Sequence, residues 1–333
     1  MNTTPSSSPH HASTTESDQP ASEQATSLDD TRTREPASGG TALVLGGGGS
    51  TGNAWLIGVI AGLFDGGLDA TTADLTIGTS AGSTTAAQIS GANPTDLFVA
   101  TVAAVPPQQS GPPRSSRAGA ASGPVVNQLE RTSRIIASAS DPVDMRRRLG
   151  AAALEMDATS DDVTQARWRA TVAARLPGLR WPPRTVLITA LDARTGEPAV
   201  FDRHSGVELV DAVAASCSSG FAYRIGDDWF IDGGYRTNSD NADLAAGLGR
   251  VLVLSPFGGR SRTPESWGLH LANQVDELRA HGSSVETIFP DSSAEHMFGA
   301  NAMDLSLRPP AAHAGFEQGR SLATQLTEWW WSR

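Results

Sequence analysis

The sequence predicts an α/β fold with a mostly parallel central sheet. From residue 40 on, short and almost wholly apolar runs alternate with longer segments of helical periodicity. This is the pattern of buried parallel strands joined by crossover helices. Two of the apolar runs end in glycine-rich turns, at residues 46–52 and 78–82, and a segment of helical periodicity follows each turn.

The individual elements follow from the same periodicities. The apolar runs predict strands at residues 41–45, 75–77, 185–190, 199–201, 229–231 and 251–254. The helical segments predict helices at about 53–66, 81–91, 125–139, 141–155, 159–175, 207–216, 241–248, 268–281 and 315–331. Residues 105–124 are rich in Pro, Ser, Gly and Arg, and we interpret them as a long loop, either a tolerated insertion or a flap over the site.

Two parts of the chain differ in composition. Residues 1–39 are rich in Ser, Thr, Pro and acidic residues and nearly lack large apolar side chains, so we expect a disordered acidic tail. Residues 40–333 are expected to form a single folded domain. The sequence has no apolar run long enough to span a membrane and no recognisable signal peptide, which predicts a cytoplasmic protein. The three Trp at residues 329–331 fit either packing on the domain or transient contact with a membrane or micelle surface.

The composition excludes several functions. All 25 basic residues of the 333 are Arg, and the lack of Lys excludes a Schiff-base enzyme and a Walker A loop. Cys217 is the only cysteine, which excludes an intrachain disulfide and a thiolate-rich metal site. The net charge of −11 opposes binding to nucleic acid. We expect neither a metal nor a cofactor, and the sequence defines no oligomeric state.

The first expected strand leads into a glycine loop, residues 46–52, which reads Gly-Gly-Gly-Gly-Ser-Thr-Gly. Without Cβ atoms, several N–H groups can face one concavity beside the positive end of a helix, so the loop is suited to hold negative charge. Gly47, Gly49 and Gly52 also satisfy the dinucleotide-binding fingerprint, which leaves a nucleotide-binding module as an alternative. That alternative requires an acidic residue at the end of the second strand, whereas Asp74 begins it.

The second expected strand leads into a G-x-S-x-G sequence, Gly78 to Gly82, which is followed by an Ala/Thr-rich helix. In this context the sharp turn holds the serine in a strained conformation and presents its hydroxyl, while the flanking glycines prevent clashes. Ser80 is therefore a candidate nucleophile, and Gly78 and Gly82 support its turn.

A third motif, Asp232-Gly233-Gly234, follows the expected strand at 229–231. Parallel sheets gather the carboxyl ends of their strands along one edge, so we expect the Asp232 carboxylate beside Ser80. Gly233 and Gly234 let the backbone turn tightly around that carboxylate.

A triad with a histidine is the alternative arrangement around the same serine and aspartate. In an ordinary α/β-hydrolase the chain order Ser, Asp, His allows Ser80, Asp232 and one of His270, His296 and His313. None of these histidines lies in a recognisable catalytic motif.

Together the motifs resemble the patatin-like phospholipase family. The resemblance covers nearly all of residues 41–255 and rests on strand–GGGGSTG–helix, strand–GTSAGS–helix and FIDGG, in that order. The sequence VAASCSSGF at residues 213–221, ahead of FIDGG, is also similar to that family. The resemblance implies a three-layer α/β/α fold with a mostly parallel central sheet.

The resemblance also implies a Ser–Asp dyad in place of a triad. On this chain Ser80 is then the nucleophile, Asp232 its base, and the N–H groups of Gly47, Gly48 and Gly49 the oxyanion hole. The implied activity is a serine acyl hydrolase of lipids or other carboxylic esters, similar to a phospholipase A. An acyltransferase or a biosynthetic thioesterase with the same dyad is the alternative. Because a carboxylate is a weak base, we expect burial or a neighbouring acid to raise the pKa of Asp232.

The chain departs from the family pattern at two positions. Thr51 stands where members usually carry Arg or Lys, and Ser219 stands where many have Pro before Gly220. The first departure bears on phospholipid specificity more than on catalysis, because the backbone donors of the loop remain.

Overall fold

The computed structural model describes residues 38–104, 124–157 and 162–332, all within one compact unit, Arg34–Arg333. The expected tail at 1–37 and nearly all of the expected loop at 105–124 lie outside the described residues. The last two residues of the expected tail, 38 and 39, already belong to the first strand.

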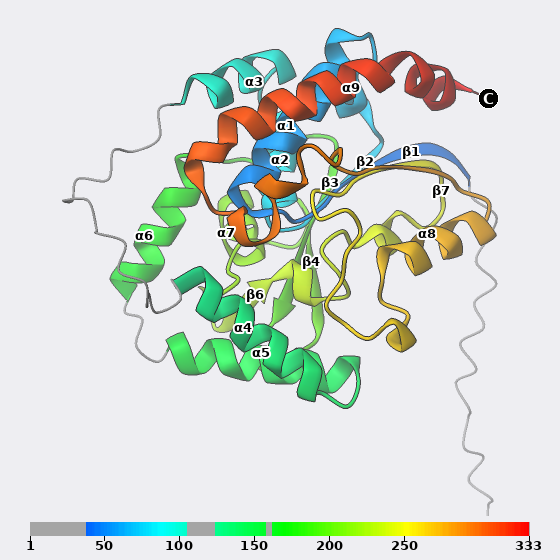
Figure 1. Ribbon diagram of the computed structural model, residues 1–333. Helices are drawn as coiled ribbons and strands as arrows, with labels where there is room; N and C mark the ends of the chain where they lie inside the picture. Colours follow the sequence, from blue (N-terminus) through cyan, green and yellow to red (C-terminus); the bar gives the residue numbers. More distant parts are fainter. Residues whose placement is uncertain (1–37, 105–123, 158–161, 333) are drawn as a thin grey trace, which may run out of the picture. The chain divides into compact units, whose positions relative to one another are not determined.

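An eight-stranded sheet forms the centre of the described part (Figure 1). The strands are hydrogen-bonded in the sequence β5-β6-β3-β2-β1-β7-β8, in which each strand pairs with its neighbours in the series, and β4 also pairs with β3. The strands β1, β2, β3, β7 and β8 are parallel, whereas β4 and β6 run antiparallel to β3, and β5 antiparallel to β6. Their bounds are β1 Ser38–Leu45, β2 Leu75–Gly78, β3 Thr185–Asp192, β4 Pro198–Phe201, β5 Tyr223–Ile225, β6 Asp228–Asp232, β7 Leu248–Leu254 and β8 Ser284–Ile288.

Two strands share one edge of β3 and meet end to end. Ile188 of β3 pairs with Gly78 of β2 and also with Phe201 of β4, so β2 and β4 lie on opposite edges of β3. Ala190 pairs with β4 as well and with Asp232 of β6, so β6 lies on the same edge as β2. Because β2 is parallel and β6 antiparallel to β3, the carboxyl ends of β2 and β6 point toward each other.

Helices cover both faces of the sheet. Their bounds are α1 Gly49–Asp65, α2 Ala81–Ile89, α3 Pro94–Ala103, α4 Pro124–Ser138, α5 Pro142–Asp157, α6 Asp162–Ala173, α7 Leu209–Ser216, α8 Leu271–Ala280 and α9 Arg308–Trp331. Alternate residues of a strand point to opposite faces. Leu43 and Leu45 of β1 pack into a core with α1, α2, α7 and α9, and Ala42 and Val44 pack into a second core with α8. The predicted three-layer α/β/α fold is therefore confirmed.

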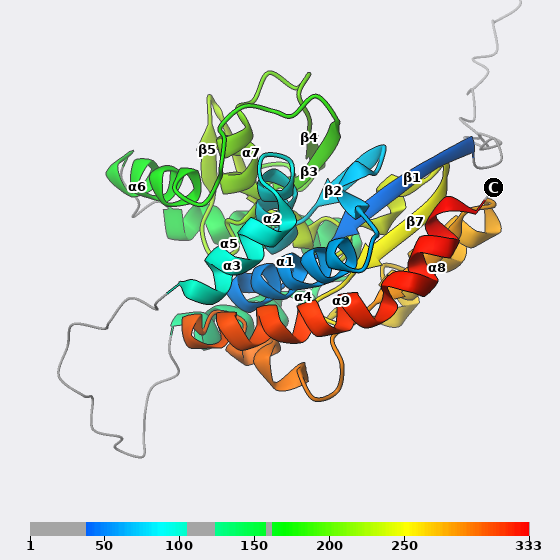
Figure 2. The same cartoon turned by 90° about the horizontal axis from the view of Figure 1, so that it is seen from above.

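The helix α1 is buried around its whole circumference over most of its length. One side faces the sheet, and α3 and α9 lie against the others (Figure 2). A helix that is apolar on all sides is stable only in such surroundings. This packing fixes the start of α1, and with it the glycine loop that precedes the helix.

Most expected elements are present, with four differences. The strands β5 and β8 and the helix α3 were not predicted, since β5 has only three residues and the alternation in β8 is weak. The helix expected at 241–248 is wrong: a 3₁₀ turn spans Ala242–Ala245, and Gly247, with φ of +93°, leads the chain directly into β7.

Candidate active site

The serine at the end of β2 occupies a strained turn. Ser80 has φ of +52° and ψ of −114°, and α2 begins at the next residue. A β-carbon at Gly82 would lie 1.9 Å from the carbonyl oxygen of Leu45, so this turn fits against β1 only with glycine there. The N–H of Ser80 donates to Ser216 Oγ at 2.9 Å, which fixes the turn to the end of α7. This geometry is that of a nucleophile held at the carboxyl end of a strand.

The aspartate at the end of β6 faces this serine. Ser80 Oγ donates a hydrogen bond to Asp232 Oδ2 at 2.8 Å, and the N–H of Gly234 donates to Asp232 Oδ1 at 2.8 Å. The N–H of Asp232 donates to the carbonyl oxygen of Ser218 at 3.0 Å. The two side chains meet because β2 and β6 converge end to end on β3, rather than because two parallel strands lie side by side as expected.

Burial makes the Asp232 carboxyl a stronger base than an exposed one. Only 6% of the residue is exposed, and this loss of hydration raises its pKa from 3.8 to about 6. The hydrogen bonds from Gly234 and Ser80 and the charge of Arg262 lower the pKa and offset part of the rise. At neutral pH the group is therefore ionised and able to accept a proton, as general-base catalysis requires.

The glycine loop lies beside the serine hydroxyl. A β-carbon at Gly47 would be 3.5 Å from Ser80 Cβ. The N–H of Gly47, however, donates to the carbonyl oxygen of Ser239 at 2.7 Å. The N–H groups of Gly48 and Gly49 have no acceptor among the described residues, and they lie at the positive end of α1. Two of the three expected donors therefore lack a protein acceptor within the described residues.

Several polar groups near the site carried no signal in the sequence. Tyr235 Oη and Gln128 Nε2 both donate to the carbonyl oxygen of Ser219, at 3.0 and 2.6 Å, and so bring α4 to the site. Burial and the nearby carboxylate of Asp232 raise the pKa of Tyr235 to about 12, so its hydroxyl remains protonated. Cys217 Sγ donates to the carbonyl oxygen of Ser80 at 3.1 Å.

The histidines of the alternative triad lie in other surroundings. His270 Nε2 contacts the carbonyl oxygen of Thr263 at 2.8 Å, and His296 Nδ1 contacts that of Ser293 at 2.9 Å. The ring of His313 packs edge-on against Phe98. Within the described residues, none of the three forms a hydrogen bond with the serine or the aspartate of the site.

The acidic residue of the nucleotide-binding alternative is also engaged elsewhere. Asp74 Oδ2 accepts from the N–H of Thr41 at 2.8 Å and from its hydroxyl at 3.2 Å. These contacts are at the start of β2, whereas the glycine loop follows the end of the parallel strand β1. A carboxylate that binds a ribose must lie at the carboxyl ends of the strands, whereas Asp74 lies at the amino end of β2.

Sequence comparison assigns the family. The model of the patatin-like phospholipases matches residues 43–245. The chain belongs to the patatin-like phospholipase family. This membership implies a lipid acyl hydrolase that acts on carboxylic esters.

Two solved structures are similar to this chain. The structure of VipD from Legionella pneumophila has 12% identity and a TM-score of 0.37, over 87% of this chain and 67% of that one. The type III effector protein ExoU has 14% identity and a TM-score of 0.32, over 86% of this chain and 54% of that one. A comparison with curated proteins gives no match.

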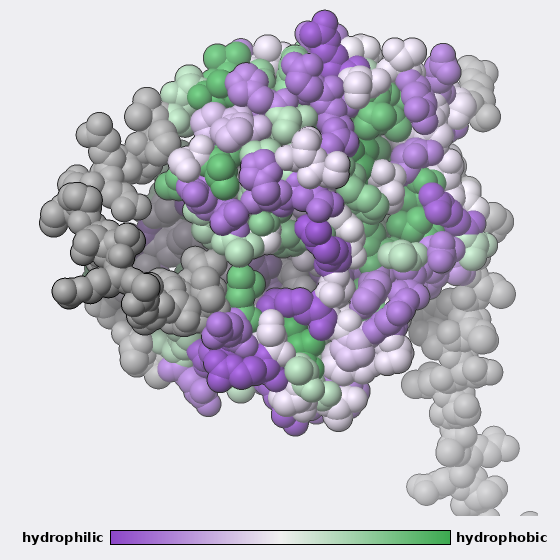
Figure 3. Space-filling model, in the orientation of Figure 1, coloured by the Kyte–Doolittle hydropathy of each residue, from purple (hydrophilic) through white to green (hydrophobic). Residues whose placement is uncertain are grey.

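The surface of this patatin-like domain is mixed. On the face seen in Figure 3, hydrophilic side chains gather over α4 and α5. Arg131, Arg134, Arg148 and Glu155 of these helices line an open cavity of about 370 Å³. No helix in the described ranges is both long and apolar enough to cross a bilayer.

Proposed function

We propose that this chain is a serine acyl hydrolase of lipid-like carboxylic esters, with Ser80 as nucleophile and Asp232 as its only side-chain base. The observation that carries the proposal is the 2.8 Å hydrogen bond from Ser80 Oγ to the buried Asp232 carboxylate. Membership of the patatin-like phospholipase family supports the ester as substrate.

In the proposed reaction, Asp232 accepts the hydroxyl proton of Ser80 as Oγ attacks the ester carbonyl carbon. The tetrahedral intermediate collapses when Asp232 returns this proton to the departing alcohol, which leaves an acyl-serine. Asp232 then takes a proton from water as the water attacks the acyl group, and Ser80 recovers its proton when the acid leaves. General-base assistance of this kind contributes about 10²- to 10⁴-fold to the rate.

The oxyanion is best assigned to the amides of Gly48 and Gly49. Both are at the start of α1, where the helix dipole favours negative charge, and neither has an acceptor in the described part of the chain. Each such donor contributes roughly 3 kcal/mol to the stabilisation of the transition state. The amide of Gly47 has the supporting task of holding the loop to Ser239.

The proposal is tested by hydrolysis of short p-nitrophenyl esters. Ser80→Ala should remove all enzyme-dependent hydrolysis, because Ser80 is the hydroxyl that donates to Asp232 among the described side chains. Ser90→Ala, at the far end of α2, is the matched control, since the contact of its hydroxyl within the described residues is with the carbonyl oxygen of Ala86. It should retain the wild-type rate. Equal hydrolysis by wild type and Ser80→Ala would contradict the proposal.

The same assay separates hydrolysis from acyl transfer. Products are analysed with and without an added long-chain alcohol or amine. We expect the free acid to be the main product in both cases. A product that carries the acyl group on the added acceptor would instead identify a transferase with the same dyad.

A further inference from the structure

Two residues other than glycine have a positive φ in the described part of the chain, Ser80 at +52° and Asn241 at +55°. Such conformations cost about 1–3 kcal/mol and persist only where the surroundings hold them. The nucleophile turn explains the first. Asn241 follows β6 in a loop that ends in a 3₁₀ turn, and the proposed reaction gives it no task. Its side chain, however, explains why it is held there.

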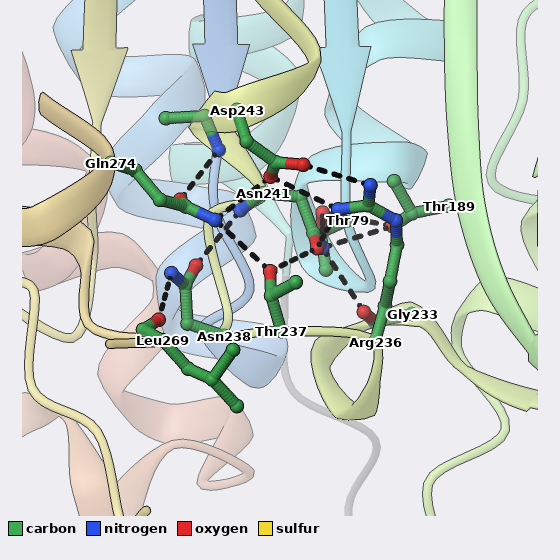
Figure 4. Close-up of polar contacts among 11 residues, drawn as sticks. Thr79, Thr189, Gly233, Arg236, Thr237, Asn238, Asn241, Asp243, Leu269 and Gln274 are labelled. Carbon is green, nitrogen blue, oxygen red and sulfur yellow. Dashed lines mark hydrogen bonds and ion pairs between the residues drawn. The ribbon is translucent and has the colours of Figure 1, made fainter. Parts of the chain in front are cut away.

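The side-chain amide of Asn241 contacts both segments that carry the dyad (Figure 4). Its Nδ2 donates to Thr79 Oγ1 at 2.9 Å and to the carbonyl oxygen of Gly233 at 3.0 Å. Thr79 immediately precedes Ser80, and Gly233 immediately follows Asp232. One NH₂ group thus joins the end of β2 to the end of β6.

The other end of the same side chain is fixed as well. Asn241 Oδ1 accepts from Thr237 Oγ1 at 2.8 Å and from Arg236 Nη1 at 3.1 Å. Arg236 is held in turn by an ion pair with Asp243 at 2.8 Å. Gln274 Nε2 of α8 donates to Thr237 Oγ1 and to Asp243 Oδ1, which closes the network (Figure 4).

The centre of the network is buried. Asn241, Thr79 and Thr189 are all 0% exposed. Thr189 Oγ1 of β3 donates to Thr79 Oγ1 at 2.9 Å. The strand β3 therefore also contacts the residue that follows β2. Both hydrogens and the oxygen of the Asn241 amide are used, and a buried amide satisfied in this way is held in one geometry.

We propose that Asn241 is a positioning residue that sets the distance and direction between Ser80 Oγ and the Asp232 carboxylate. The inference rests on the proposed function, because it assigns Asn241 a role in the same dyad. Asn241 touches neither substrate nor reacting atoms. It acts through Thr79 on the nucleophile and through Gly233 on the base.

Two substitutions separate the side chain from the strained backbone. Asn241→Gly keeps a residue that tolerates positive φ but removes the amide. Asn241→Asp keeps the oxygen that faces Arg236 and Thr237 but replaces the donor by an acceptor that faces the carbonyl oxygen of Gly233. We expect both to lower kcat about 10- to 100-fold with KM changed less than about 2-fold, as a misplaced reacting group does.

A pH profile supplies a readout that loss of stability alone does not move. The hydrogen bond from Ser80 lowers the pKa of Asp232, so a misaligned dyad should shift the acid limb of kcat/KM to higher pH. Gln318→Ala is the matched control, because it removes a side-chain amide with a partner on α1 and others far from β2 and β6. Its kcat and acid limb should equal those of the wild type at a temperature where all variants are folded.

The experiment measures kcat, KM and the acid limb with a p-nitrophenyl ester for wild type, Asn241→Gly, Asn241→Asp, Thr79→Val and the double variant Thr79→Val/Asn241→Gly. The expected result is a lower kcat in both Asn241 variants and a double variant no slower than the worse single one, since both act on one joint. Wild-type kcat and acid limb in a folded Asn241→Gly or Asn241→Asp would overturn the inference. Activity in wild type that is lost in Ser80→Ala shows that the proposed function holds whichever way this result falls.

Discussion

Two buried carboxyl groups, one at the end of β6 and one in the loop that follows it, have different hydrogen-bond partners. Asp232 is 6% exposed and Asp240 is 1% exposed, and burial raises the pKa of both, to about 6 and about 7. Asp232 receives hydrogen bonds from Ser80 and Gly234 on its two oxygens. Among the described residues, the donor that favours the ionised form of Asp240 is Ser255.

The two carboxyls differ in how many of their oxygens accept a hydrogen bond. Asp240 Oδ1 has no hydrogen-bond partner in the described ranges and lies against the backbone of Gly46, where a β-carbon would be 2.2 Å away. Burial favours the protonated form of a carboxyl, and each donor to its oxygens favours the ionised form, so donors on both oxygens offset more of the effect of burial than a donor on one. We conclude that burial raises the pKa of both carboxyls, and that the donors on both oxygens of Asp232 favour its ionised form, which can act as a base.

The largest expected effect separates the two carboxyls by activity. Asp232→Asn should lower kcat/KM for ester hydrolysis by about 10²- to 10⁴-fold, because the amide cannot accept the Ser80 proton. Asp240→Asn should stay within about 3-fold of wild type, since the residue touches neither Ser80 nor the amides of Gly48 and Gly49. Steady-state kinetics at pH 8 measures both. A similar loss in the two variants would remove the distinction drawn here.

The pH dependence of the wild type sharpens the comparison. Below its pKa of about 6, Asp232 is protonated and cannot act as a base, so kcat/KM should fall as pH is lowered through about 6. Asp240→Asn should leave this limb in place. The measurement is kcat/KM from pH 4.5 to 8.5. An acid limb that shifts in Asp240→Asn would show that the limb reports Asp240 and not Asp232.

The smallest expected effect concerns stability. A carboxyl whose pKa is higher in the folded than in the unfolded protein stabilises the fold below its unfolded pKa near 3.8, and this contribution is lost as pH rises through the folded pKa. Asp232→Asn and Asp240→Asn should therefore raise the free energy of unfolding at pH 8, at about 1.4 kcal/mol per unit of pKa difference.

The gain should be larger for Asp240→Asn, whose parent carboxyl has the higher pKa, and should shrink toward pH 4 in both variants. Urea unfolding at pH 4 and pH 8 tests this order. Destabilisation of both variants at pH 8 would show that the two carboxylates stabilise the fold when ionised.

The sequence could predict those parts of the site that local chemistry defines. The turn at Ser80 needs small residues around it, because a β-carbon at Gly82 would clash with the carbonyl oxygen of Leu45. Such a requirement can be recognised from residues that are adjacent in the sequence. The glycine loop and the Asp232 motif were found in the same way. Apolar runs that alternate with helical segments also sufficed to predict the α/β class, because each face of β1 has its own core. The three-layer arrangement was implied by the family resemblance.

Long-range contacts account for what the sequence could not predict. The end-to-end meeting of β2 and β6 depends on the register of both strands on β3, which no local pattern encodes. The N–H of Gly47 donates to the carbonyl oxygen of Ser239, which is distant in the sequence. The sequence therefore could not show which N–H groups of the loop lack a protein acceptor. Asn241 lay within a stretch expected to be helical, and its role is visible only beside Thr79 and Gly233.

Covalent labelling of the full-length chain with a fluorophosphonate tests the central claim most directly. The adduct is located by peptide mass spectrometry and its rate of formation is followed from pH 5 to 8. The account predicts one adduct, on Ser80, which forms faster as Asp232 ionises and at least 100-fold more slowly in Asp232→Asn. An unlabelled wild type, an adduct on another residue, or an equal rate in Asp232→Asn would contradict it.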